Sequence, residues 1–228
     1  MSFEGEARFF CGLLPPGRPP RRVLVVGCGD GVEAAHIARE TGASVAGIDF
    51  GVSASARRPG VHLVRADARA MPFRDGEFDA LYCYHVLEHV PGPGRAVAEA
   101  RRVLASGGLA FFGTPNKSRQ VGYIGGRATT WEKVRWNLAD WGRRLTFRWS
   151  NERGAHAGFA ADELGRLLGG AFGGVREVSV PYYAAKYPRL ATFWTRSFRL
   201  GIGRWFAPSV YFVASDAPAD RPRRVHAT

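Results

Sequence analysis

Three glycines and an aspartate are the residues whose types and spacing most clearly point to chemistry. Gly27, Gly29 and Gly31 follow the β-branched run RVLVV and precede a helical pattern. Glycine has no Cβ, so a ligand can approach the backbone at such a turn, where the first N–H groups of the helix lack partners. Asp49 ends the next apolar run, where an acid meets the hydroxyls of a bound ribose in nucleotide-binding folds. The pattern predicts a nucleoside-binding turn; the alternative is a tight turn without ligand, with Asp49 capping the next helix near Ser53.

Two acidic residues beside the glycines bear on which cofactor the turn could hold. Asp30 lies within the turn, and Val32-Glu33 stands where a dinucleotide fingerprint has its third glycine. A pyrophosphate needs a bare helix N-terminus, and two carboxylates would repel it. S-adenosylmethionine (SAM) has no phosphate and carries an ammonium and a sulfonium. The acids therefore disfavour a dinucleotide more than they disfavour SAM.

Alternating strands and helices would position these residues. Short apolar runs predict strands at 22–27, 43–48, 61–65, 78–84, 109–113, 175–180 and 209–214. Helical periodicity is found at 31–41, 94–104 and 159–168, with Val32, Ala35, Ile37 and Ala38 facing inward in the first. Strands that alternate with helices predict parallel βαβ units with helices on both faces of the sheet.

The length of 228 residues suits one α/β domain with insertions. We expect a single domain over 1–215 and a disordered Pro/Arg-rich tail over 216–228. No apolar run approaches the ~20 residues that span a bilayer, and the first ten residues lack the apolar core of a signal peptide. The three cysteines have neither disulfide nor zinc spacing. The sequence thus predicts a cytoplasmic protein with reduced thiols and no metal.

Charge and tryptophan content divide the chain into two unlike halves. The net charge is +12; residues 1–115 hold 13 basic and 12 acidic side chains, whereas residues 116–228 hold 19 and 8. All six tryptophans also lie in the second half. Codon bias accounts for the excess of arginine over lysine, but it does not explain why basic and tryptophan residues share one half.

Several motifs in order resemble the class I SAM-dependent methyltransferases. These are VLVVGCGDG, VAGIDFG, VRADARAMPFRDGEFDALYCYHVLEHV and RRVLASGGLAFFGTPN. The resemblance covers about residues 20–116, and 156–180 less firmly, and is closest to the small-molecule group that includes quinone-biosynthesis enzymes. It implies a Rossmann-like, seven-stranded, mostly parallel sheet whose last strand is antiparallel. It also implies SAM as cofactor.

The resemblance further implies roles for individual residues at the strand ends. Gly27, Cys28 and Gly29, with Gly31 completing the turn, would line the methionine part of SAM through their backbone. Asp49 would hold the ribose.

On the adenine side, the resemblance places three further residues. Phe50 would lie beside the adenine, Asp67 would accept its amino group and Ala68 would donate its backbone N–H. Phe50 could equally belong to the core.

Histidines are the candidates for a base. The resemblance places Tyr84 and His85 near the sulfonium and the substrate, and related enzymes often carry a pocket-facing histidine where His156 stands. A hydroxyl acceptor must lose its proton, so His156 and His85 are the predicted catalytic residues. The alternatives are that His85 and His89 are packed, hydrogen-bonded histidines and that His156 only makes local hydrogen bonds at a helix start.

The fourth predicted strand is not followed by an Asp/Asn-Pro-Pro-aromatic signature, which marks many enzymes that methylate base amines or glutamine amides. Tyr84-His85-Val86-Leu87 stands in its place. This disfavours nucleic acid and favours O-methylation of a small or lipid-linked acceptor by direct in-line transfer. Two alternatives stay open: an RNA methyltransferase, and a SAM-binding protein without transferase activity that serves as a membrane or partner-binding module.

Two basic, aromatic inserts, 116–157 and 181–207, are predicted at the carboxyl edge of the sheet, as a substrate lid. Helical spacing would place in one stripe Trp131, Val134, Leu138, Trp141 and Leu145. A second stripe would hold Leu190, Phe193, Trp194, Ser197 and Phe198. Basic amphipathic helices with tryptophans suit an anionic membrane surface or a lipid-linked substrate, and basic aromatic patches also bind RNA. The alternative is that both stripes pack on the domain.

Overall fold

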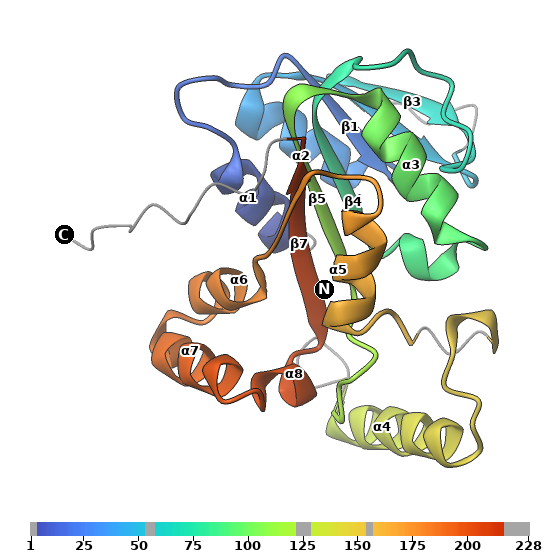
Figure 1. The fold of residues 1–228 in the computed structure, drawn as a ribbon, viewed down its shortest axis with the longest axis vertical. Helices are drawn as coiled ribbons and strands as arrows, with labels where there is room; N and C mark the ends of the chain where they lie inside the picture. The colour runs from blue at the N-terminus through green and yellow to red at the C-terminus, as the bar shows by residue number, and fades with distance from the viewer. Residues whose placement is uncertain (1–3, 53–57, 122–128, 154–156, 217–228) are drawn as a thin grey trace.

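The computed structural model describes residues 4–52, 58–121, 129–153 and 157–216. They form a seven-stranded sheet in the order β3-β2-β1-β4-β5-β7-β6 (Figure 1). The strands are β1 (Arg22–Val26), β2 (Ser44–Asp49), β3 (Val61–Arg65), β4 (Phe78–Tyr84), β5 (Leu104–Pro115), β6 (Gly174–Glu177) and β7 (Ser209–Ser215). Strands β1 to β5 pair in parallel, and β7 is antiparallel to both of its neighbours. The predicted mostly parallel, Rossmann-like sheet is confirmed.

Helices cover both faces of this sheet. One face packs against α1 (Glu4–Leu13), α2 (Val32–Thr41), α6 (Ser179–Lys186) and α7 (Ala191–Arg199). The other packs against α3 (Pro93–Val103) and α5 (Ala161–Gly169). Along β1 the side chains alternate between the two cores, because successive residues of a strand point to opposite faces. Both cores are needed to hold the strand ends in register.

The second insert differs from its predicted form. The strand predicted over 175–180 ends at Glu177, and α6 begins at Ser179. The buried hydroxyl of Ser179 accepts a hydrogen bond from the N–H of Tyr211 at 3.0 Å. Pro181 then falls in the first turn of α6, where its missing N–H costs nothing. The apolar residues Val178 and Val180 gave this segment its strand-like pattern.

The two ends of the sequence also depart from expectation. No element was predicted over residues 4–13, yet α1 forms there and buries Phe10 completely. Its Glu6 accepts hydrogen bonds from the hydroxyl of Tyr182 and the Nζ of Lys186, which ties α1 to α6. Val32, predicted to face inward, is 46% exposed because it opens α2 at the edge of the sheet. The tail predicted to be disordered, apart from Asp216, lies outside the described residues.

The carboxyl ends of β1, β2, β4 and β5 lie at one edge of the sheet, and both inserts leave from that edge. Residues 116–157 follow β5 and contain α4 (Thr130–Leu145); α6, α7 and α8 (Gly203–Phe206) connect β6 to β7. In Figure 1, α4, α7 and α8 lie at the same end of the molecule. Both inserts thus leave the sheet at its carboxyl edge, and α6 begins at Ser179, two residues before the predicted start of the second insert.

Candidate active site

The glycine turn after β1 is shaped by backbone that other residues would strain. Gly27, Gly29 and Gly31 have φ values of 72°, 51° and 82°, a left-handed region that favours glycine. A Cβ on Gly27 would lie 2.1 Å from Cγ2 of Val86, whereas one on Gly29 would meet nothing within 4 Å. Gly27 therefore permits close packing of the turn on β4, and Gly29 leaves open space above the turn.

Asp49 ties this turn to the end of β2. Its Oδ2 accepts a hydrogen bond from the N–H of Gly29 at 3.0 Å, and its Oδ1 accepts one from the N–H of Gly51 at 2.7 Å. The carbonyl oxygen of Ile48 accepts hydrogen bonds from the N–H groups of Gly27 and Cys28, with N–O distances of 2.8 and 3.0 Å. The carboxylate is thus held at the carboxyl edge, at the place predicted for a ribose-binding acid.

A cavity of about 270 Å³ opens beside Asp49. Its lining residues come from the ends of β1, β2, β3 and β4: Val26, Gly27, Ile48, Asp49, Phe50, Ala66, Ala68, His85, Val86, His89 and Val90. The Phe50 side chain is 60% exposed and therefore does not belong to the core. Apolar walls, one exposed aromatic ring and one carboxylate suit a nucleoside without phosphate, so the residues present fit SAM.

Not every predicted cofactor residue lines the cavity. Gly31 is the N-cap of α2 and lies outside the lining. The Sγ of Cys28 points inward, since a Cβ on Gly47 would lie 2.8 Å from it, and burial raises the pKa of Cys28 to about 12. The Cys28 side chain is therefore unsuited to contact a cofactor, and the predicted contact through its backbone stays a prediction.

Asp67 and Tyr84, like Cys28 and Gly29, also lie outside the lining. The Asp67 carboxylate accepts hydrogen bonds from Arg69, with Oδ2 2.8 Å from Nη2, and this pairing lowers the pKa of Asp67. Its neighbours Ala66 and Ala68 do line the cavity. The Tyr84 ring stacks on Tyr211 at 6.2 Å, and burial raises its pKa well above the usual value. The adenine role of Asp67 stays a prediction.

His85 lies in the cavity wall in an unusual backbone conformation. Its φ is 54°, and its N–H bonds the carbonyl of Gly113 at 2.8 Å. Left-handed conformation in a non-glycine residue is often kept where function requires it. The His85 ring stands 4.2 Å from that of Tyr84, centroid to centroid.

Glu88, which the sequence analysis did not single out, lies beneath two histidines. Its Oε1 is 3.7 Å from Nδ1 of His85 and 4.0 Å from Nε2 of His89, and its side chain is 1% exposed. Neither carboxylate oxygen has a hydrogen-bond partner among the described residues. Burial raises the pKa of Glu88 to about 7, against the opposing effect of its own backbone N–H and of Arg119. The spacing HxxEH was the available signal.

His156 lies outside the described residues, so its catalytic role stays a prediction. The chain beside it is placed: Ala157 is fully buried, and the N–H of Phe159 bonds the carbonyl of Pro115 at 3.0 Å. This segment therefore runs along the end of β5, at the carboxyl edge. The cavity lining all comes from residues 26–90, so the lid role of the two inserts also stays a prediction.

The two acids near the glycine turn are less exposed to a ligand than the sequence suggested. Asp30 pairs with Arg58 at 3.1 Å. The Tyr82 hydroxyl donates to Oε1 of Glu33 at 3.2 Å, and burial raises the pKa of Glu33 to about 7. Their repulsion of a pyrophosphate is therefore weaker than predicted, and the choice of SAM depends more on the resemblance.

A larger hollow of about 790 Å³ lies at the opposite edge of the sheet, and its lining includes residues 14, 15 and 17–21 and Ser106-Gly107-Gly108. Ligands of open α/β sheets bind at the carboxyl edge, and this hollow lies beyond the amino ends of the strands. We therefore assign the site to the smaller cavity. Within the described residues, no three His, Cys, Asp or Glu side chains are grouped as metal ligands would be.

Comparison with known proteins defines the class. Residues 24–112, which span β1 to β5, match the methyltransferase domain family. They carry the glycine turn, Asp49 and the whole cavity lining. The resemblance to the class I SAM-dependent methyltransferases is confirmed over these residues.

Individual relatives narrow the comparison. A ubiquinone biosynthesis O-methyltransferase of Paracidovorax citrulli is 36% identical over 112 residues, which are 44% of this chain and 46% of the relative. One of Sodalis glossinidius is 40% identical over 110 residues, 43% of either chain. The match thus spans less than half the length of these relatives.

Solved structures extend the likeness to the whole fold. A phosphoethanolamine N-methyltransferase of Haemonchus contortus in complex with SAM has a TM-score of 0.59 at 16% identity, over 93% of this chain and 52% of that one. The [4+2]-cyclase SpnF has a TM-score of 0.55 at 20% identity, over 92% and 79%. Because one of these neighbours is described as a cyclase, the likeness shows the fold alone.

Proposed function

We propose that this protein is an enzyme that transfers the methyl group of SAM to a hydroxyl oxygen of a small or lipid-linked acceptor. The observation that carries the proposal is the position of Asp49, held by Gly29 and Gly51 at the wall of an apolar cavity that also contains Phe50 and His85. The curated relatives named as O-methyltransferases support the choice of oxygen.

In this proposal the chain's own residues bind and align. Asp49 accepts hydrogen bonds from the two ribose hydroxyls, and the exposed ring of Phe50 covers the adenine. The open space above Gly29 admits the methionine part. SAM supplies an activated methyl carbon for in-line displacement. Alignment of nucleophile, carbon and sulfur supplies about 7–11 kcal/mol of barrier lowering.

His85 accepts the proton of the acceptor hydroxyl. Its side chain lies in the cavity wall and is only partly buried, so an acceptor in the cavity can reach it. Glu88 acts as a positioning residue: its carboxylate, 3.7 Å from Nδ1 of His85, stabilises the imidazolium that forms. The step balances: the hydroxyl proton would move to His85, the acceptor oxygen would bond the methyl carbon, and the bond between that carbon and the sulfur of SAM would break, so that S-adenosylhomocysteine leaves. His156 is the second candidate for this base.

Calorimetric titration with S-adenosylhomocysteine tests the cofactor site. We expect micromolar binding by the wild type and at least a tenfold loss in Asp49→Ala. Asp30→Ala is the matched control, because Asp30 lies in the same turn, is 72% exposed on its side chain and does not line the cavity. No binding by the wild type, or equal loss in both variants, would refute the assignment.

A labelled-methyl assay then tests the acceptor. The wild type and His85→Ala are incubated with methyl-labelled SAM and, separately, with phenolic acceptors, lipid extract and RNA. Label in an ether product of a phenolic or lipid acceptor, lowered in the variant, supports O-methylation. Label only in RNA, or S-adenosylhomocysteine binding without turnover on any acceptor, contradicts it.

A further inference from the structure

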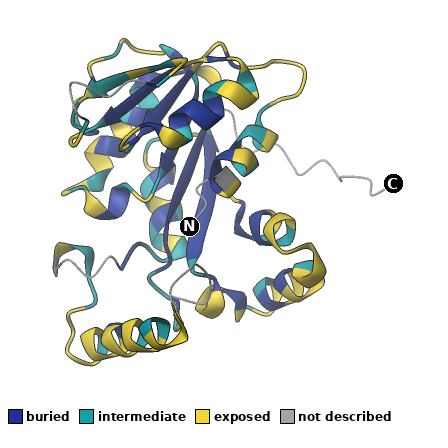
Figure 2. Ribbon diagram, turned by 180° about the vertical axis from the view of Figure 1, so that it is seen from behind, coloured by how far each residue is buried: buried dark blue, intermediate teal, exposed yellow. Residues whose placement is uncertain are grey.

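Helix α4 turns its apolar side to solvent. We call Trp131, Val134, Leu138, Trp141 and Leu145 the α4 stripe. Leu145 is 76% exposed, Trp131 74% and Leu138 65%, and Figure 2 shows most of α4 as exposed. A helix on a globular domain normally buries such a stripe. The alternative that the stripe packs on the domain is therefore wrong for α4.

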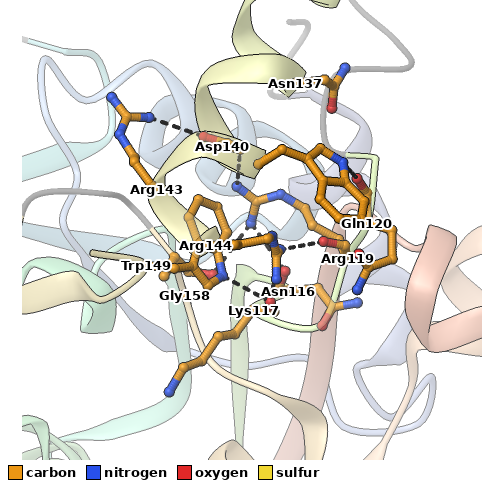
Figure 3. Close-up of polar contacts among 12 residues, drawn as sticks. Asn116, Lys117, Arg119, Gln120, Asn137, Asp140, Arg143, Arg144, Trp149 and Gly158 are labelled. Atoms are coloured by element: carbon orange, nitrogen blue, oxygen red, sulfur yellow. Dashed lines mark hydrogen bonds and ion pairs between the residues drawn. The ribbon is translucent and has the colours of Figure 1, made fainter. Parts of the chain in front are cut away.

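Polar side chains of α4, together with Nε1 of Trp141, which donates to the carbonyl of Gln120, fasten the helix to the segment that follows β5 (Figure 3). Asp140 is 6% exposed and lies 3.5 Å from Nη2 of Arg119. Arg144 donates to the carbonyls of Lys117 and Arg119, and its guanidinium lies 4.3 Å from the ring centroid of Trp149. The stripe is thus held outward by buried ion pairs and hydrogen bonds rather than left out by loose attachment.

The second insert presents further exposed apolar residues at the same end. Trp194 of α7 is buried and stacks on Tyr183, so the second predicted stripe packs on the domain in part. Phe193 remains 52% exposed and Trp205 of α8 47%. The N–H of Gln120, in the first insert, bonds the carbonyl of Trp205 at 2.7 Å. The two inserts are therefore joined where their apolar residues are exposed.

We propose that the α4 stripe, together with Phe193 and Trp205, docks on the surface of a membrane that contains anionic lipids. The second half of the chain has 19 basic and 8 acidic residues, so an anionic surface is attracted. A second copy of a chain with net charge +12 is repelled by the same charges. Residues 217–228 contain one large aliphatic residue, Val225, which is too little to cover the stripe.

This contact would be peripheral. In the parts of the chain that the structure describes, no helix combines the length and the apolarity needed to cross a bilayer. The inference does not depend on methyl transfer, since it follows from the exposed stripe and the charge alone. If the proposed function also holds, docking brings the carboxyl edge, and with it the cavity, towards a lipid-borne acceptor.

Vesicle co-sedimentation of the full chain tests the docking. Vesicles of phosphatidylcholine with 30% phosphatidylglycerol are compared with pure phosphatidylcholine, and S-adenosylhomocysteine binding is measured on the same samples. We expect the wild type to prefer the anionic vesicles. The double variant Leu138→Asp/Leu145→Asp should lower the partition coefficient at least about tenfold, because two apolar side chains no longer enter the interface.

Ala139→Asp is the matched control, since it adds a charge to an exposed position of α4 outside the stripe. It should retain most of the binding, and all variants should bind S-adenosylhomocysteine like the wild type. Quenching of tryptophan fluorescence by brominated acyl chains should fall in Trp131→Phe. Equal vesicle binding by the double variant and the control would overturn the proposal. The proposal would also be overturned if the protein formed concentration-dependent dimers, or bound RNA, but did not bind vesicles.

Discussion

The two regions that meet at the carboxyl edge are stabilised in opposite ways. Residues 22–112 bury mainly aliphatic and aromatic side chains, such as Leu24 and Ile48, and Glu88 is a buried carboxylate among them. The first insert buries Arg119 and Asp140 and exposes Leu138 and Leu145. The first pattern is that of an ordinary water-soluble core. The second is expected of a segment whose apolar side is meant for another surface.

The same contrast separates the residues that match the methyltransferase domain family from those that lie outside the match. The matched residues 24–112 carry the cavity, whereas α4 lies outside the match. A shared cavity accounts for a common cofactor. We expect the particular acceptor to depend on the inserts, since both leave the sheet at the carboxyl edge where the cavity lies. The comparison predicts that substitutions in the two regions have separable effects.

The largest expected effect comes from the junction of the two regions. Gly158 has a φ of 77°, and a Cβ there would lie 1.7 Å from the carbonyl oxygen of Pro115. We expect Gly158→Ala to destabilise the fold by about 4 kcal/mol, because strain and overlap with fixed backbone add. Urea unfolding followed by circular dichroism measures it. A cost under 1 kcal/mol would mean that the insert is not fixed to β5.

Two buried carboxylates, one in each region, offer the next test, because their surroundings differ. Glu88 has no hydrogen-bonded partner among the residues that the structure places, and Asp140 is buried between Arg119 and Arg143. Burial raises the pKa of Glu88 from 4.5 to about 7. Between these pH values the unfolded chain loses this proton while the folded chain keeps it, so stability contributed by Glu88 falls as pH rises from 4.5 to 7.

The Glu88→Gln variant has no titrating group at this position. Its free energy of unfolding, relative to that of the wild type, should therefore rise by about 2–3 kcal/mol between pH 4.5 and pH 8. Asp140→Asn should instead destabilise by about 2–3 kcal/mol at pH 8, because it leaves Arg119 buried without a carboxylate. Urea unfolding at both pH values distinguishes them. If both variants behaved alike, the contrast between the regions would fail.

The regular part of the fold could be predicted because its signals are local. The strands 61–65 and 78–84 match β3 and β4 residue for residue, since apolar runs bounded by turn residues leave few choices. Asp49 and the glycines could be placed because strand ends and tight turns constrain residue type. The end of β6 could not, because Val178 and Val180 look like strand residues until Ser179 is seen to bond Tyr211.

The inserts show what the periodicity of a sequence cannot predict. The spacing of Trp131, Val134 and Leu138 predicts one side of a helix, and α4 has that side. It does not say whether the side faces the domain, since that depends on Arg119 and Arg144 finding partners distant in sequence. Glu88 was missed for a similar reason: its burial beneath His85 is a tertiary property that HxxEH only hints at.

The smallest expected effects come from two glycines with empty space where a Cβ would stand. Gly142, inside α4, and Gly29, in the cofactor turn, both have nothing within 4 Å of that position. Gly142 is helical, so Gly142→Ala should stabilise α4 by about 0.5–1 kcal/mol through helix propensity. Gly29 has a φ of 51°, so Gly29→Ala should cost about 1 kcal/mol.

Because α4 is held by polar contacts apart from the core, the gain should appear as slower hydrogen exchange within 130–145 with little change in global unfolding. The loss at Gly29 should lower S-adenosylhomocysteine affinity and leave exchange in α4 unchanged. A change in both regions from either substitution would show that they are one cooperative unit, and the comparison would have to be given up.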